Sequence, residues 1–209
     1  DVLVPPHDIG MATAYDDSYN LTPARLLRMV LGLGYRGAII HYVGMSHYFR
    51  LAAQAGDLLV AQPAALCGPC EAWHGAFLAE CARLDYQPIL SLSYELFAEN
   101  CPADWAQRAF DGSQALTGWV PPSTLLSPAN AQAMGWLQDV GAAFTALAVL
   151  AGLPVHFQIG EPWWWITPGG KICIYDAAVS ATQGSVPDIP DLSAPLNAAQ
   201  LAHLDWAGA

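Results

Sequence analysis

Apolar and polar positions follow the same order three times along the chain: apolar residues at helical spacing, a very short turn, and then a continuous apolar run. The predicted pairs of helix and strand are 22–34 with 37–43, 73–84 with 88–94, and 128–152 with a strand that begins at 155. Apolar strands without alternation are typical of a parallel sheet that is covered by helices. The pattern therefore predicts an α/β fold.

The first and third predicted helices are each preceded by residues that commonly begin a helix. Thr22 is a good N-cap and Pro23 suits the first helical position, while Ser127 and Pro128 repeat the same pair before the third helix. A proline at the first helical position loses no hydrogen bond, because its missing N–H would have no partner there. We therefore expect helices to begin at both places.

The rest of the chain contains too few strands for a closed barrel. After residue 176 the sequence becomes polar and proline-rich, and it ends with a short helical pattern over 197–206. A complete (β/α)8 barrel needs about 250 residues, whereas this chain has 209. We predict a TIM-barrel-like α/β fold that is incomplete, about the first half with long loops. It forms one domain over 1–209 with its core at 15–176, and the chain is expected to be a fragment or to be completed by another chain.

Composition excludes several classes of partner. Hydrophobic residues make up 54% of the chain, and the formal net charge is −11 with only seven Lys and Arg residues. No basic patch is available to neutralise phosphates, so we expect neither nucleic acid nor an anionic membrane as a partner. The longest apolar run, 140–155, contains two glycines and a proline and is interpreted as the end of a core helix, without membrane insertion.

The third predicted strand ends at a carboxylate, Glu161, which is followed by Pro162 and by Trp163, Trp164 and Trp165. Ligands bind at the carboxyl ends of strands in parallel α/β folds. Tryptophan faces stack on sugar rings, and their low-dielectric surroundings raise the pKa of an acid. We therefore predict a sugar-binding site here. The alternative is that the tryptophans cap the core and Glu161 is a structural carboxylate.

A second carboxylate, Glu95, ends the second predicted strand and is expected at the same rim. Glycoside hydrolysis uses such a pair, about 5 Å apart for retention and farther apart for inversion. The alternative is that two strand-end acids meet by chance. Tyr94, His41 and Trp119 complete the predicted substrate-binding residues, with Trp119 on a long segment, 97–126, that is expected to wall the cleft.

Other motifs are interpreted as structural. Cys67 and Cys70 have the spacing of a thioredoxin-type redox motif at a helix start, and disulfide exchange is kept as a minor alternative. His41 has no metal-ligand spacing with other histidines or with acids, so we predict no metal and no cofactor. The five cysteines are expected to be reduced and mostly buried.

Several longer motifs together carry a family resemblance. They are Tyr19–Pro23, His41–Gly44, Ser91–Leu96, Gly118–Ser123 and Gln158–Trp165. The chain resembles the TIM-barrel domain of non-contractile tail sheath proteins of phages and prophages. It is also similar to the glycoside-hydrolase-like barrel of gene transfer agent tail proteins. The likeness covers residues 15–176.

The resemblance implies a structural protein of the virion tail, made in the host cytoplasm, that assembles with other tail subunits, including copies of itself. Its glycoside-hydrolase-like barrel is then expected to bind host polysaccharide. The alternative is an active glycoside hydrolase with Glu161 in the acid/base position and Glu95 as its partner. Gly160 stands where such enzymes commonly have an asparagine, and no residue carries over as the nucleophile.

Overall fold

A four-stranded parallel sheet forms the centre of the computed structural model, which describes residues 4–64, 66–161 and 163–209. Its strands lie in the order β1, β2, β5, β8, and every neighbouring pair is parallel. Their bounds are Met11–Ala14 for β1, Ala38–Val43 for β2, Gln87–Ser93 for β5 and Phe157–Gly160 for β8. The predicted α/β class is confirmed. Within the described residues the sheet ends at β1 and β8, so the barrel is not closed.

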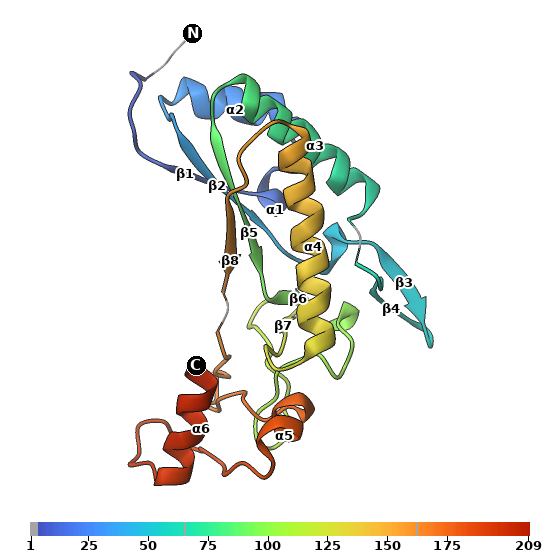
Figure 1. Cartoon of the computed structure of the whole chain (residues 1–209), viewed down its shortest axis with the longest axis vertical. Coiled ribbons are helices and arrows are strands. Elements are labelled where there is room, and N and C mark those ends of the chain that lie inside the picture. Colours follow the sequence, from blue (N-terminus) through green and yellow to red (C-terminus); the bar gives the residue numbers. More distant parts are fainter. Residues whose placement is uncertain (1–3, 65, 162) are drawn as a thin grey trace.

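Three long helices connect these strands: α2 (Pro23–Gly32), α3 (Gly68–Arg83) and α4 (Ala131–Leu150). Figure 1 shows α2 and α3 near the end of the sheet from which the N-terminus leaves, and α4 running alongside the strands. The main core combines side chains of the three helices with those of β2 and β5, among them Leu27, Ile39, Phe77, Leu90, Val140 and Phe144. This is the helix-covered arrangement that the non-alternating strands predict.

Two of the predicted units agree closely with the structure, and one strand lies outside the prediction. The helix α2 begins as expected, because the Thr22 hydroxyl accepts a hydrogen bond of 3.3 Å from the backbone N–H of Arg25. Strand β2 begins one residue later than predicted, and β5 begins and ends one residue earlier than predicted. The strand β1 was not predicted, since its four residues include two alanines and form no apolar run.

The start predicted for the third helix is wrong. Asn130, rather than Ser127, is the N-cap of α4, and its side-chain oxygen accepts hydrogen bonds of 3.0 Å from the N–H groups of Gln132 and Ala133. Ser127 instead binds the preceding segment, where its backbone N–H donates to the carbonyl of Trp105 at 2.7 Å. This tertiary contact holds Ser127 in a turn, and the helix begins three residues later.

By length and composition, α4 is a helix that could cross a membrane, with 20 residues and a mean hydropathy of 1.3. The apolar run 140–155 considered in the sequence overlaps only the second half of α4. The length of that run therefore says nothing about whether the whole helix is long enough to cross a membrane. Six of its residues are buried in the protein core: Ala133, Trp136, Leu137, Val140, Phe144 and Ala148. Core helices pass the same test of length and composition, and one face of α4 packs into the core.

Two antiparallel hairpins extend the strand ends. β3 (Leu51–Gln54) pairs with β4 (Asp57–Val60), and β6 (Glu95–Phe97) pairs with β7 (Ser123–Leu125). The 25 residues between Phe97 and Ser123 therefore leave β6 and return to it as β7. The short helices α1 (Tyr15–Ser18), η1 (Ser46–Tyr48) and η2 (Ala98–Asn100) also follow strands.

The segment after β8 forms a hairpin and then two helices, α5 (Ala177–Gln183) and α6 (Ala198–Gly208). A bridge between Ile166 and Ile172 joins the two arms of this hairpin, and the predicted C-terminal helix is present with Asn197 as its N-cap in a capping box. Figure 1 shows α5 and α6 at the end of the molecule opposite to the N-terminus. Leu204 and Ala207 of α6 pack on a separate small core around Ile172, Ile174 and Ile189.

Candidate functional site at the strand ends

One cavity of about 260 Å³ lies where all four parallel strands end. It is lined by Ala14 of β1, Val43 of β2, Ser93 of β5 and Gly160 of β8. The carboxyl ends of parallel strands meet at one edge of the sheet, and this edge holds the ligand sites of α/β barrels. We call this cavity the strand-end pocket.

Four carboxylates line the strand-end pocket: Asp16, Asp17, Glu95 and Glu161. The aspartates belong to α1, which directly follows β1. Glu161 directly follows β8, and Glu95 lies two residues after the end of β5. No Lys, Arg or His is among its described lining residues. The structure therefore brings the two glutamates predicted from the sequence to one pocket and adds two aspartates to them.

Glu95 is buried at the base of the pocket with 8% of its surface exposed. Its Oε1 atom has no hydrogen-bond partner among the residues that the structure describes. Burial is the main cause that raises the pKa of the Glu95 carboxyl, while a hydrogen bond with the Ser123 side chain lowers it, and the nearby charges of Glu161 and Asp16 raise it further. Glu95 thus has the surroundings of a carboxyl that retains its proton more readily than usual.

Glu161 lies in different surroundings. It is exposed, and its backbone φ of 55° lies in the left-handed region that a residue with a Cβ rarely adopts. Such strained positions are found disproportionately at functional sites. The left-handed residue also turns the chain away from the direction of β8 directly after Gly160.

Glycines provide space at the floor of the pocket. A Cβ placed on Gly160 would lie 2.9 Å from the Oγ of Ser91, and one on Gly44 would lie 2.8 Å from the Oγ of Ser93. Ser91 is 1% exposed, and its hydroxyl has no hydrogen-bond partner in the described part of the chain. Ser91 is therefore a second buried polar group in the lining that includes Glu95.

Aromatic side chains form part of the pocket lining, namely Tyr42, Tyr48 and Trp119. Trp119 belongs to the long segment between β6 and β7, which was predicted to wall a cleft. It is 49% exposed, and its indole N–H donates a hydrogen bond of 3.3 Å to the Ser123 hydroxyl. Trp119 thus offers a solvent-accessible ring face at the same pocket as Glu95.

The three consecutive tryptophans do not line the strand-end pocket in the described structure. Trp164 packs on the small core around Ile174, and its indole N–H donates to the carbonyl of Ala207 at 2.7 Å. Trp165 packs on a second small core formed by Ala109, Ala115 and Cys173. Only Trp163 is largely exposed, at 49%. A sugar-stacking role for these residues stays a prediction.

His41 and Tyr94 also lie away from the pocket lining. His41 is fully buried in β2, where a hydrogen bond of 2.8 Å joins its Nδ1 to the Thr13 hydroxyl and its ring stacks on Phe77. Burial, together with His74, lowers the pKa of His41 well below its usual value. Tyr94 lines a separate apolar cavity of about 410 Å³ between α4 and the β5–β8 pair.

The remaining sequence motifs show no further site. The cysteines are free thiols, and Cys70 is buried at the first turn of α3, where burial raises its pKa to about 12. That direction is opposite to the lowered pKa of a reactive thiol. Within residues 4–64, 66–161 and 163–209, no group of three or more His, Cys, Asp or Glu residues is arranged to hold a metal ion.

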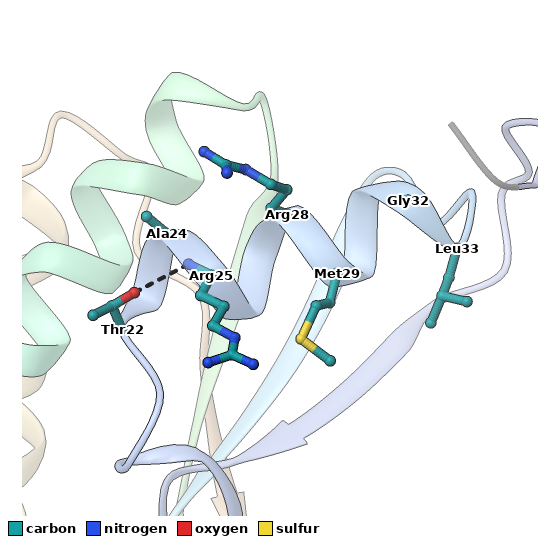
Figure 2. A pocket seen from close by; sticks show the side chains of 7 residues that line it. All are labelled: Thr22, Ala24, Arg25, Arg28, Met29, Gly32 and Leu33. Carbon is teal, nitrogen blue, oxygen red and sulfur yellow. Dashed lines mark hydrogen bonds between the residues drawn. The ribbon is translucent and has the colours of Figure 1, made fainter. Parts of the chain in front are cut away.

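A larger cavity, about 600 Å³, lies on the outer face of α2. Figure 2 shows that every labelled residue lining it comes from α2 or its two ends, and that the side chains of Arg25 and Arg28 point in different directions. It contains no carboxylate and no converging polar groups. The strand-end pocket is therefore the better candidate for a binding site.

Sequence reasoning missed Asp16, Asp17 and Ser91 as pocket residues. The two aspartates follow a strand that was not predicted, so their place at the strand ends was not apparent. A pair of adjacent acids that follows Ala12-Thr13-Ala14 after one residue is the signal that could have indicated the two aspartates.

Comparison with known families agrees with the parallel α/β sheet. Residues 5–209 match the family described as non-contractile tail sheath protein TIM barrel. The chain belongs to this family. The tail sheath barrel is therefore a component of the virion tail and assembles with other tail subunits. The family resemblance derived from the sequence motifs is confirmed.

Proposed function

We propose that the tail sheath barrel, in addition to its structural role in the tail, binds a host saccharide in the strand-end pocket. The observation that carries this proposal is the pairing of unpartnered buried polar groups, Glu95 Oε1 and Ser91 Oγ, with an exposed aromatic face, Trp119, in one cavity. Sugars present hydroxyl groups and apolar ring faces together. Ligand pockets with a few converging polar groups in a largely apolar lining are typical binding sites.

The test is binding of the purified chain to an array of bacterial surface glycans, comparing Trp119→Ala with Trp163→Ala. The two tryptophans are equally exposed, at 49%, but only Trp119 lines the pocket. We expect Trp119→Ala to weaken glycan binding roughly tenfold or more, as loss of an aromatic anchor does, and Trp163→Ala to leave it unchanged. Equal loss in both variants, or no glycan bound by the parent chain, would refute saccharide binding in this pocket.

A second candidate function, glycoside hydrolysis, is favoured by the pKa of Glu95. We propose that any hydrolytic activity would use Glu95 as the proton donor, because its pKa is raised while Glu161 is exposed. This reverses the roles that the family resemblance implies for the two glutamates. The measurement is release of reducing ends from a bound glycan, which Glu95→Gln should abolish. If the parent chain binds the glycan but releases no reducing ends, hydrolysis is refuted and only the structural and binding roles remain.

A further inference from the structure

The charge of the strand-end pocket is unusual for a site that binds a neutral sugar. Asp16, Asp17, Glu95 and Glu161 all line a cavity of only about 260 Å³, and no described lining residue is basic. Such a concentration of one charge sign attracts ligands of the opposite sign. A neutral saccharide would leave these carboxylates without a charge partner.

The unpartnered atoms at the pocket floor point to a donor on the ligand. Glu95 is 8% exposed and Ser91 is 1% exposed, and both Glu95 Oε1 and Ser91 Oγ lack partners among the described residues. A buried acceptor without a donor costs free energy, so a ligand that supplies donors is favoured here. Gly160 has no Cβ, which would otherwise lie 2.9 Å from Ser91 Oγ, and so no side chain of residue 160 fills the space beside this hydroxyl.

A protonated amine fits this combination of groups. An alkylammonium group has three N–H donors and no acceptor, and it is attracted by carboxylates and by the faces of aromatic rings. The pocket offers carboxylates together with Tyr42, Tyr48 and Trp119. An acetylated amine carries no charge and keeps only one N–H donor, so it neutralises none of the carboxylates and donates to fewer of the pocket's acceptors.

We propose that the strand-end pocket selects saccharides that carry a free, protonated amine, in preference to N-acetylated or neutral sugars. This inference rests on the proposed saccharide binding and specifies its ligand class. The ammonium group lies at the floor beside Glu95 and Ser91, and the sugar ring lies against the aromatic wall at Trp119. Glu161, at the exposed side of the pocket, contributes charge to the same ligand.

The test uses three β-1,4-linked tetrasaccharides that differ only in the substituent at carbon 2: a free amine, an acetamide or a hydroxyl. Binding to the full chain is measured by titration calorimetry at a pH below the pKa of the amines. We expect the amine to bind about tenfold or more tightly than the other two, the usual gain from charge-assisted hydrogen bonds. The preference should decrease as salt is added, because salt screens charges at a partly open site.

Variants locate the preference within the pocket. Glu95→Gln and Ser91→Ala should each reduce the preference for the amine several-fold, and Gly160→Ala should weaken all binding, because its methyl group would crowd Ser91. Asp139→Asn is the matched control, since Asp139 is an exposed acid on α4 that does not line the pocket. Thermal unfolding of each variant establishes that it is folded. If Glu95→Gln does not fold, Ser91→Ala still tests the amine preference, and Gly160→Ala still tests whether the ligand lies in this pocket.

The possible failures are distinguishable. Equal binding of all three tetrasaccharides would overturn the amine preference and leave saccharide binding intact, whereas no binding of any of them would overturn both. An amine preference that persists in both the Glu95 and the Ser91 variants would assign it to another surface. Nα-acetyl-lysine amide keeps the charged side-chain ammonium of lysine. If it competes with the affinity of the amino sugar, the pocket recognises a cationic side chain of a protein partner, and the saccharide assignment is overturned.

Discussion

The two glutamates at the strand ends contribute to the site through different local properties. Glu95 is held in low-dielectric surroundings that raise its pKa, whereas Glu161 is exposed and held at a left-handed φ of 55°. Neither property benefits folding, because burying a carboxyl and straining a backbone both cost free energy. At the residue scale, the arrangement of polar groups in the pocket therefore lowers the stability of the fold.

The strain at Glu161 predicts that a substitution there stabilises the fold. Glycine adopts left-handed φ values without the Cβ clash, so we expect Glu161→Gly to raise the free energy of unfolding by roughly 0.5–1 kcal/mol, after the greater entropy of glycine in the unfolded chain is deducted. Chemical denaturation measures the change. Glu161→Gln is the control, because it removes the charge but retains the strained backbone. A Gly variant that is less stable than the Gln variant would contradict the strain argument.

The buried histidine His74 predicts loss of stability in acid. Burial lowers its pKa from 6.5 to about 4, so the unfolded chain binds a proton at a higher pH than the folded chain does. The contribution of neutral His74 is fully present above pH 6.5 and is lost as pH falls toward 4, by about 3 kcal/mol in total. Urea unfolding at about pH 7 and about pH 4 measures this loss, and His74→Gln should show a smaller one. Equal losses would refute the assignment.

At the element scale, sequence patterns predicted the helices and strands whose own residues favour them, and missed the elements that form only through contacts with the rest of the fold. The helices α2, α3 and α4 and the strands after them could be predicted, and so could the meeting of Glu95 and Glu161 at one edge. Strand β1 could not, because its conformation comes from pairing with β2 rather than from its own residues. The tryptophans after Glu161 were expected at the pocket, but Trp164 and Trp165 pack on the two small cores instead.

Two residues near the start of α4 can be compared by mutation: Asn130, which caps the helix, and Ser127, which the sequence pattern predicted as the cap. Asn130 accepts hydrogen bonds from two N–H groups of the first turn, and its amide also donates to the carbonyl of Asp104 at 2.9 Å. We expect Asn130→Ala to lower the free energy of unfolding by about 1 kcal/mol, the usual cost of losing an N-cap. Helix content at the α4 start, followed by amide hydrogen exchange, should show fraying in this variant. Ser127→Ala is the comparison, and it should leave exchange in the first turn of α4 unchanged.

At the scale of the whole molecule, the open sheet explains why this domain needs partners. In the described part of the chain, β8 is an edge strand with Phe157 36% and Ile159 55% exposed, and the apolar cavity beside α4 lies next to it. An apolar strand edge with unpaired backbone groups tends to pair with another chain. Assembly with other tail subunits, which the family establishes, provides surroundings in which such an edge can be covered.

In a solution of this chain alone, the available partner for the β8 edge is a second copy, so we expect concentration-dependent self-association. Ile159→Lys places a charge on the exposed face of the edge, which is a common way in which natural sheets prevent edge pairing, and should reduce the associated fraction. Val120→Lys is the control, because Val120 is 94% exposed on the segment between β6 and β7. Sedimentation velocity over a range of protein concentrations measures the associated fraction. If both lysine variants associate as the parent chain does, the β8 edge is not the contact, and the outer face of α2, with Met29 and Leu33 exposed, becomes the next surface to substitute.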